Sequence, residues 1–347
     1  MPTTISAHPC IRRFVPGTPD WLWQWGGLAI TALLVGGCGP SNQDHKSAPP
    51  PPMIDNVVFI PPGDTAVTVA GMQIVFWDVA SGKRQSTITE PALVDCVTIS
   101  PDGKSLAIGH PDWTLVLQGL GPGGQRTELA GHEGDVHALA YAPDGKQLVV
   151  ASGSTNPFNK RMQVKFWDPA SGKDLGDLPM AGSAGPGMGG GRGPMARAPR
   201  PGKEAPPRSK TDGHTAMVTA LAFCPDGKRL VTAGADLTLK VWDVKRRQVL
   251  VTMRGPTDNP KAVVVLPDGR TAVSAGSEPV IRIWDLVGGK QLYALTGQPS
   301  LLGGLAASPT GLLLASGGED GMVYLWDLGQ RKLAGKLQGH RGAIQAV

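Results

Sequence analysis

A short turn sequence recurs along this chain at a fixed spacing, and this period constrains the fold more than any other feature. Three of the four steps between successive turns are 42 residues and the fourth is 82, which leaves 40 residues for an insertion. A period of this length indicates a stack of similar units, each of which buries its apolar faces against its neighbours. The Pro-Asp-Gly and Pro-Thr-Gly turns begin at Pro101, Pro143, Pro225, Pro267 and Pro309.

Each unit holds four short runs of alternating apolar residues, separated by turn-forming clusters. The stretch from Thr211 to Met253 shows them as MVTALAF, RLVTAG, LTLKVW and QVLVTM. Alternation with a period of two predicts β-strands, so each unit is expected to form a four-stranded antiparallel meander. A weaker copy precedes Pro101, which gives six complete copies between residues 54 and 347.

The units also share a Trp-Asp pair at the end of the third run and, in three places, a Gly-His pair near the start. In this the chain resembles the WD40 repeat family, whose repeats span about 40–45 residues and carry these signatures. The resemblance implies an all-β WD40-type β-propeller of four-stranded antiparallel blades, with six complete blades and a partial seventh. Trp-Asp pairs begin at Trp77, Trp167, Trp242, Trp284 and Trp326, and Gly-His pairs at Gly131, Gly213 and Gly339.

Blades of this family are tied together by a buried, hydrogen-bonded set of His, Ser or Thr, Asp and Trp. The resemblance places a complete set only in the fourth copy. A His, an Asp and a hydroxyl group in one place also resemble a hydrolase triad. However, the set recurs in part in other copies, and buried polar groups need partners. We therefore interpret it as structural and expect no catalytic residue and no metal site. The four residues are His214, Thr232, Asp236 and Trp242.

Residues 1–37 resemble an export signal. Arg12 and Arg13 precede an uncharged apolar run from Trp21 to Val35, and two glycines separate this run from Cys38. A basic start, an apolar core and small residues at the end are typical of secretory signals. Small residues before a cysteine also resemble the lipobox of bacterial lipoproteins, which implies that Cys38 is lipidated. The protein is then expected to be exported and anchored on the periplasmic or cell-surface side of a membrane. An uncleaved N-terminal helix is the alternative, because the run is near the lower length limit for spanning a bilayer.

Two further segments have a composition typical of disordered chain. Residues 38–53 include four consecutive prolines and are expected to tether the propeller of residues 54–347 to the membrane.

The insert at about 179–210 is rich in Gly and Pro, and its six Lys or Arg against one acid give a charge of +5, equal to the net charge of the whole chain. It is a candidate contact for anionic lipid or glycan, whereas nucleic acid is disfavoured because interleaved aromatic residues are missing. Its GxGxxG match from Gly185 predicts no cofactor, since no strand leads into it and no helix follows.

Strand alternation places the turns between second and third strands, and the connections between blades, on one face of the ring. Both long departures from the repeat fall on this face: the insert, and seven extra residues in the third copy. Loop variation on one face of a regular scaffold is typical of binding surfaces. The candidate partner-binding residues are Phe158, Asn159, Lys160 and Arg161.

The sequence therefore favours a non-enzymatic protein–protein interaction scaffold that binds by the insert-bearing face around blades 3 and 4. One alternative is a subunit of an envelope-assembly or transport complex. Another is a propeller enzyme with a site in the central channel, which is disfavoured because Asp95, Asp135 and His137 lie only near the starts of their inner strands.

The sequence leaves two possibilities for how the ring ends. Either six blades close and residues 339–347 dock as an extra strand or tail, or the chain is truncated and the ring is open. We expect closure, because six blades of about 42 residues suffice for a ring.

Overall fold

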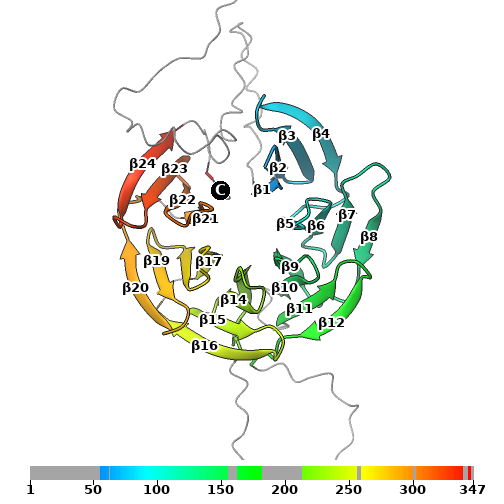
Figure 1. Cartoon of the computed structure of the whole chain (residues 1–347). Coiled ribbons are helices and arrows are strands. Elements are labelled where there is room, and N and C mark those ends of the chain that lie inside the picture. Colours follow the sequence, from blue (N-terminus) through cyan, green and yellow to red (C-terminus); the bar gives the residue numbers. More distant parts are fainter. Residues whose placement is uncertain are drawn as a thin grey trace, which may run out of the picture.

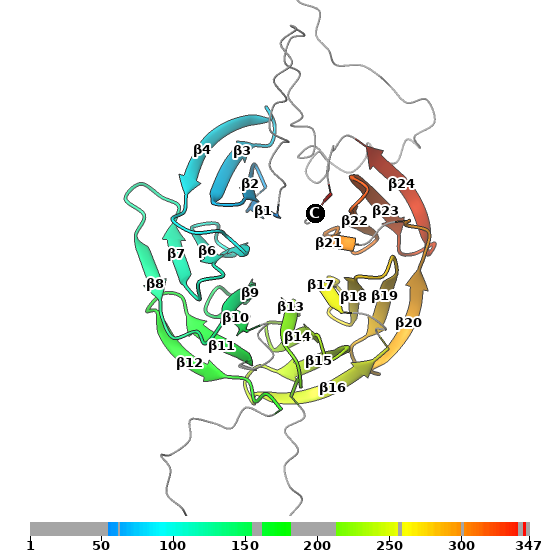
Figure 2. The same ribbon diagram turned by 180° about the vertical axis from the view of Figure 1, so that it is seen from behind.

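The computed structural model describes residues 55–61, 63–154, 162–181, 213–255, 259–299, 302–338 and 343–344. The export signal, Cys38, the tether, the residues from Phe158 to Arg161 and nearly all of the insert lie outside these ranges, so those assignments stay predictions. Within the ranges, the strands form six four-stranded antiparallel sheets, each built from four consecutive strands. The sheets stand around a common centre as the blades of a propeller (Figures 1 and 2), which confirms the all-β fold with six complete blades. The same ranges contain no helix that is long and apolar enough to cross a membrane.

We number the blades 1 to 6 in chain order and name the strands of each blade a to d from the centre outward (Figure 1). Blade 1 is β1 (Asn56–Ile60), β2 (Thr65–Ala70), β3 (Gln73–Asp78) and β4 (Lys83–Thr89); blade 2 is β5 (Cys96–Ile99), β6 (Ser105–Gly109), β7 (Leu115–Gly119) and β8 (Arg126–Leu129); blade 3 is β9 (Asp135–Tyr141), β10 (Leu148–Gly153), β11 (Met162–Asp168) and β12 (Lys173–Asp177). Blade 4 is β13 (Val218–Phe223), β14 (Arg229–Gly234), β15 (Thr238–Asp243) and β16 (Gln248–Arg254); blade 5 is β17 (Pro260–Val265), β18 (Thr271–Gly276), β19 (Ile281–Asp285) and β20 (Lys290–Leu295); blade 6 is β21 (Leu302–Ala307), β22 (Leu313–Gly318), β23 (Met322–Asp327) and β24 (Lys332–Gln338).

The Pro-Asp-Gly turns join strands a and b, and blade 4 shows why these residues are used. Gly227 has a φ of 66°, in the left-handed region that glycine adopts without strain. Asp226 Oδ1 accepts hydrogen bonds from the backbone N–H groups of Lys228 at 2.8 Å and Arg229 at 3.2 Å. Asp side chains commonly satisfy turn backbone in this way. The turn therefore sets the register in which β13 and β14 pair.

The core lies between the blades, because the facing sides of consecutive sheets are buried against each other. In blade 4, Trp242 belongs to a buried cluster with Phe166 of blade 3. Val241 directly precedes Trp242 and lies on the opposite face of the sheet, where it belongs to a buried cluster with Trp284 of blade 5. The tryptophans of the Trp-Asp pairs in blades 3 to 6 thus face the preceding blade. The buried members of this series are Trp167, Trp242, Trp284 and Trp326, with exposed fractions of 5, 0, 0 and 1%.

The ring is open between blade 6 and blade 1. The inner strand of each blade packs against the inner strand of the next blade along the chain. The first such pair is β1 with β5, and the last is β17 with β21. No comparable packing joins β21 to β1 within the part of the chain that the structure describes. Both views show the opening, between the blue blade 1 and the red blade 6 (Figures 1 and 2). The expectation that six blades would close on one another is therefore wrong for the described residues.

The two residues described after β24 lie in this opening. Ile344 is 6% exposed and donates its backbone N–H to the carbonyl oxygen of Gly318, at the end of β22, at 3.0 Å. At the junction of blades 2 and 3, Val136 donates in the same way to His110 at 3.2 Å. The chain thus enters the opening where the first strand of a further blade belongs. Ala343 and Ile344, the two residues described there, form no strand, so the partial seventh blade stays a prediction.

Candidate functional site

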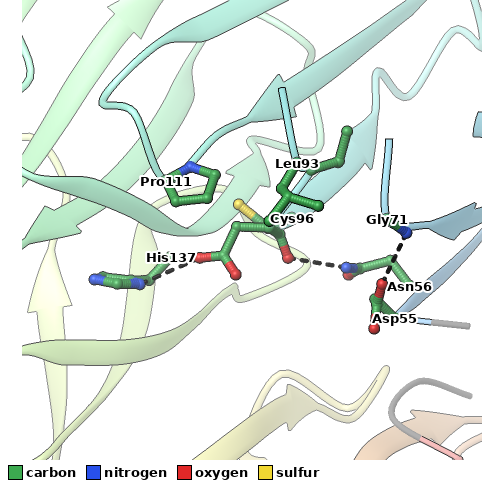
Figure 3. Close-up of a pocket in the computed structure, with 9 residues that line it drawn as sticks. Asp55, Asn56, Gly71, Leu93, Cys96, Pro111 and His137 are labelled. Carbon is green, nitrogen blue, oxygen red and sulfur yellow. Dashed lines mark hydrogen bonds and ion pairs between the residues drawn. The ribbon is translucent and has the colours of Figure 1, made fainter. Parts of the chain in front are cut away.

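A pocket of about 430 Å³ opens on the face that carries the turns between strands b and c, which we call the b–c face. It lies where the inner strands of blades 1, 2 and 3 begin (Figure 3). The sequence predicted a partner-binding surface on this face, but around blades 3 and 4. Residues that shape the pocket include Asp55, Asn56, Leu93, Asp95, Cys96 and His137.

His137 in β9, labelled in Figure 3, and Asp95, just before β5, form the charged centre of the pocket. His137 Nδ1 lies 3.3 Å from Asp95 Oδ2, and His137 Nε2 lies 3.1 Å from the carbonyl oxygen of Gly153. Both partners are acceptors, so only an imidazolium with two N–H groups satisfies both contacts. Burial opposes this charged form, but the hydrogen bond and charge of Asp95 outweigh it and raise the pKa of His137. A histidine stabilised in its protonated form is poorly suited to act as a general base.

Hydrogen bonds between separate segments hold the pocket lining in place. Asn56 Nδ2–H donates to the carbonyl oxygen of Asp95 at 3.0 Å and so joins blade 1 to blade 2. The backbone N–H of Gly71, in the b–c turn of blade 1, donates to Asp55 Oδ2 at 3.1 Å. The pocket is therefore preformed, as ligand and partner sites commonly are.

The pocket provides no activated nucleophile. Cys96 is 7% exposed, and its thiol donates to the carbonyl oxygen of Val136 at 3.3 Å. Burial, together with the charge of Asp95, raises the pKa of the thiol, which is opposite to the shift found in reactive cysteines. Among the residues that the structure describes, no three His, Cys, Asp or Glu side chains gather as a candidate metal site.

Large apolar side chains are exposed around the pocket. Met72, Leu93 and Trp113 have exposed fractions of 46, 59 and 50%, and all three lie in the b–c turns of blades 1 and 2 or in the connection between these blades. Trp113 has a φ of 75°, which is uncommon for a bulky residue. Its Nε1–H donates to Asp135 Oδ1 at 3.0 Å. Exposed apolar side chains grouped around a concavity are typical of contact surfaces.

The structure brings together the four residues that the sequence assigned to one set in blade 4. Trp242 Nε1–H donates to Thr232 Oγ1 at 2.8 Å, and Thr232 Oγ1 lies 2.7 Å from His214 Nε2. His214 Nδ1 lies 3.0 Å from each carboxylate oxygen of Asp236. All these contacts are satisfied when Thr232 donates to His214 Nε2 and a neutral His214 donates from Nδ1 to Asp236.

Burial and hydrogen bonds set the charges of this group. Burial lowers the pKa of His214, which keeps the imidazole neutral although Asp236 favours the cation. Burial acts to raise the pKa of Asp236, but the hydrogen bond and charge of His214 and further hydrogen bonds outweigh it and lower this pKa. His214 and Thr232 are fully buried. A substrate cannot reach the Thr232 hydroxyl, so the group acts on stability and not as a triad.

Blade 3 contains the same types of residue without these bonds. Within the described ranges, both ring nitrogens of His132, the Ser152 hydroxyl and Trp167 Nε1 are buried and have no hydrogen-bond partner. Burial, with a contribution from the charge of Lys165, lowers the pKa of His132 to about 4. Lys165 Nζ is instead paired with Asp174 at 3.1 Å. The blade that carries both long departures from the repeat thus lacks the hydrogen bonds that tie blade 4.

A buried ion pair at blade 2 was missed at the level of sequence. The Glu90 side chain is fully buried, and its oxygens accept hydrogen bonds from Arg126 Nη1 and Nη2 at 2.8 and 2.6 Å. His110 Nε2 lies 3.4 Å from the same carboxylate. The hydrogen bond from Arg126 lowers the pKa of Glu90 despite its burial. The three residues come from a connection, a turn and an outer strand and follow no repeated spacing, so the sequence carries no signal for them.

Comparison with known proteins supports the repeats. The WD domain, G-beta repeat family matches residues 123–168, 206–243 and 289–327. Over 123 residues the chain is 25% identical to the serine-threonine kinase receptor-associated protein of Rattus norvegicus, a stretch that covers 35% of this chain and 33% of that protein. Over 202 residues it is 29% identical to the anaphase-promoting complex subunit cdc20 of Dictyostelium discoideum, covering 54% of this chain and 38% of that protein. The chain thus spans only a third or somewhat more of the length of these relatives. These matches support WD40 repeats in the three matched stretches, and the topology shows six four-stranded blades in a propeller arrangement.

Proposed function

We propose that the protein is a non-enzymatic scaffold that binds other proteins by its b–c face. The observation that carries the proposal is the grouping of exposed Met72, Leu93 and Trp113 around one pocket of that face. Covering these side chains in a complex removes apolar surface from water, which favours association. The fold alone does not fix the partner, so the chemistry of this surface has to define it.

The charges around the pocket favour a partner segment in which an apolar side chain lies next to a cationic one. Asp55 lines the pocket, Asp112 precedes Trp113 in the turn, and Asp135 accepts the hydrogen bond from the Trp113 ring. Carboxylates at the edge of a contact surface attract and orient groups of opposite charge. The face of an exposed indole also attracts Lys or Arg.

Affinity capture with paired variants tests this surface. We expect Leu93→Ala/Trp113→Ala to weaken capture of the bound partners at least about tenfold, because central apolar contacts contribute about 1–2 kcal/mol each. The control Val287→Ala/Leu312→Ala removes side chains that are 67 and 56% exposed on turns of the opposite face, and it should capture normally. Equal losses in both variants, or none in the first, would contradict the assignment.

A second arm of this experiment addresses blade 3. Replacing residues 158–161, Phe-Asn-Lys-Arg, by alanine tests whether the b–c turn of blade 3 extends the same surface. If this replacement, combined with Leu93→Ala/Trp113→Ala, weakens partner capture further than that double variant alone, the turn belongs to the contact surface. Normal capture would confine the contact to blades 1 and 2.

We further propose that the scaffold is displayed on the outer side of a bacterial membrane by a lipid on Cys38. The support is the apolar run up to Val35 followed by small residues and a cysteine. In a bacterial host, we expect labelled palmitate to be incorporated into the full chain and to be lost in Cys38→Ser. Cys10→Ser is the matched control, because Cys10 precedes the apolar run, and it should keep the label. Label that persists in Cys38→Ser would contradict the anchor.

A further inference from the structure

Each of the three exposed apolar residues beside the pocket is hydrogen-bonded through its backbone to one of two buried residues. The carbonyl oxygen of Met72 accepts from the backbone N–H of Glu90 at 2.8 Å. The carbonyl oxygen of Leu93 lies 2.8 Å from His110 Nδ1, and the backbone N–H of Trp113 donates to the carbonyl oxygen of His110 at 3.3 Å. We call Met72, Leu93 and Trp113 the apolar triplet. Its members lie in three separate segments, so the residues that join these segments decide how the triplet is arranged.

The side chains of the two buried residues contact each other between blades 1 and 2. Glu90 directly follows β4 of blade 1, and His110 directly follows β6 of blade 2. Glu90 and His110 are 2 and 1% exposed, and His110 Nε2 lies 3.4 Å from the Glu90 carboxylate. Arg126 of β8 donates two hydrogen bonds to the same carboxylate. The three backbone bonds of the triplet thus lead to one buried contact, and Arg126 holds that contact in place.

The imidazole of His110 bonds directly to the connection that carries Leu93. His110 Nδ1 faces the carbonyl oxygen of Leu93, and because a carbonyl only accepts, Nδ1 carries the proton. The next residue, Val94, donates its backbone N–H to the carbonyl oxygen of Gly71 in blade 1 at 2.9 Å. The connection is therefore held to both blades at the point where the Leu93 side chain projects into solvent.

The histidine is a departure from the repeat. Leu106 of β6 pairs with Gln118, which stands at the place of the tryptophan, and His110 follows Leu106 by four residues. Counted in the same way from the residue that pairs with tryptophan, blades 4, 5 and 6 have glycine. The blade scaffold therefore does not require a side chain at this position, and the contact with Leu93 is specific to the junction of blades 1 and 2. The three glycines are Gly234, Gly276 and Gly318.

We propose that Glu90 and His110 are positioning residues of the b–c contact surface, which fix the connection carrying Leu93 beside the turn carrying Trp113. The inference rests on the proposed function, because it assigns both residues to the surface that binds the partner. A surface whose apolar side chains are already in place loses less conformational freedom on binding, which strengthens association. Both residues are buried, so they act through the triplet and not by touching the partner.

Two substitutions of His110 separate its two side-chain contacts. Asparagine places an amide N–H near the position of Nδ1 and keeps a donor for Leu93, whereas the longer glutamine places one near Nε2 and keeps only the contact with Glu90. We expect His110→Gln to speed hydrogen exchange in residues 91–95 at least about tenfold, because a typical hydrogen bond is lost. His110→Asn should leave this exchange within about threefold of the parent, for the same reason. Mass spectrometry of the full 347-residue chain measures the exchange at one pH.

Thr232→Val in blade 4 is the control for a general loss of stability. It removes a buried hydrogen-bonded hydroxyl far along the chain from this junction, and it should leave exchange in residues 91–95 as in the parent. Equal exchange in His110→Gln and His110→Asn would overturn the proposal, and so would a comparable increase in Thr232→Val. If His110→Gln does not fold, His110→Phe, which keeps a ring but neither nitrogen, takes its place with the same expected result.

Partner capture gives the second readout. His110→Gln should weaken capture of the partners bound by the parent chain at least about threefold, since a loosened side chain has to be ordered again on binding, and His110→Asn should capture normally. Fast exchange with normal capture in His110→Gln would overturn the positioning role. Normal capture by Leu93→Ala/Trp113→Ala would instead overturn the b–c surface itself, and the exchange comparison would still show whether His110 holds Leu93. The two proposals therefore fail in distinguishable ways.

Discussion

Thr232→Val is expected to lower the free energy of unfolding by about 2–4 kcal/mol. Valine has nearly the same shape as threonine, so the change leaves no cavity, but it removes the hydroxyl that links Trp242 Nε1 to His214 Nε2 at 2.8 and 2.7 Å. Both nitrogens are then buried without a partner, and each unsatisfied group costs about 1–3 kcal/mol. Chemical denaturation followed by tryptophan fluorescence measures the change.

Ser152→Ala in blade 3 is the matched control. Its hydroxyl is buried on β10, the second strand of its blade, but two residues beyond the position that corresponds to Thr232. It has no hydrogen-bond partner within the described ranges, so its removal should change the free energy of unfolding by less than about 0.5 kcal/mol. A loss in Ser152→Ala as large as that in Thr232→Val would contradict the assignment of blade 4 as the hydrogen-bonded blade. It would show that a buried hydroxyl on the second strand of a blade stabilises the fold whatever its partners.

The architecture could be predicted from the sequence because it depends on local patterns that repeat. Period-two alternation gives each strand, and the Asp and Gly of turns such as that at Gly227 give each hairpin. The 42-residue spacing then requires neighbouring units to bury one another. Even blade 2, which has Gln118-Gly119 where Trp-Asp is expected, forms β7 in register with β6, since the alternation of its apolar residues is intact.

The hydrogen-bonded sets could be predicted only in part. In blade 6, Gln298 stands where the family has His, and its Oε1 accepts from the Ser316 hydroxyl at 2.8 Å, so the contact is kept with another residue. Trp326 Nε1–H donates to the same hydroxyl at 3.0 Å. Asp320, which precedes Trp326 by six residues as Asp236 precedes Trp242, accepts from the Tyr324 hydroxyl at 2.5 Å. Alignment identifies residue types, but neighbouring side chains decide which partner each acid takes.

The pocket could not be predicted because it depends on how distant segments meet. The pair of Asp95 and His137 joins residues 42 positions apart in two blades, and the exposed grouping of Leu93 and Trp113 arises from connections that the repeat leaves free.

Arg126→Met is expected to cost about 2–4 kcal/mol of unfolding free energy. It leaves the fully buried carboxylate of Glu90 without its guanidinium partner and with the His110 ring 3.4 Å away. Removing one partner of a buried ion pair typically costs about 3–5 kcal/mol, and the value is lower here because the Arg126 side chain is 41% exposed. The double variant Glu90→Gln/Arg126→Met should recover most of the loss, since the amide no longer carries a buried charge.

The same pair predicts how stability depends on pH. The pKa of folded Glu90 is lowered, chiefly by its hydrogen bond with Arg126, so the folded state binds this proton less readily than the unfolded state does. The stabilisation is therefore present above the ordinary pKa of glutamate, about 4.3, and is lost as the pH falls through the lower folded value. Arg126→Met should reduce this acid-side slope. Arg246→Met is the control, because Arg246 pairs with Asp243 at 2.8 Å on the surface with its side chain 74% exposed, and such pairs contribute about 0–1 kcal/mol. If both methionine variants lost the same free energy of unfolding at neutral pH, burial of the Glu90 carboxylate would not explain how much its ion pair contributes to stability.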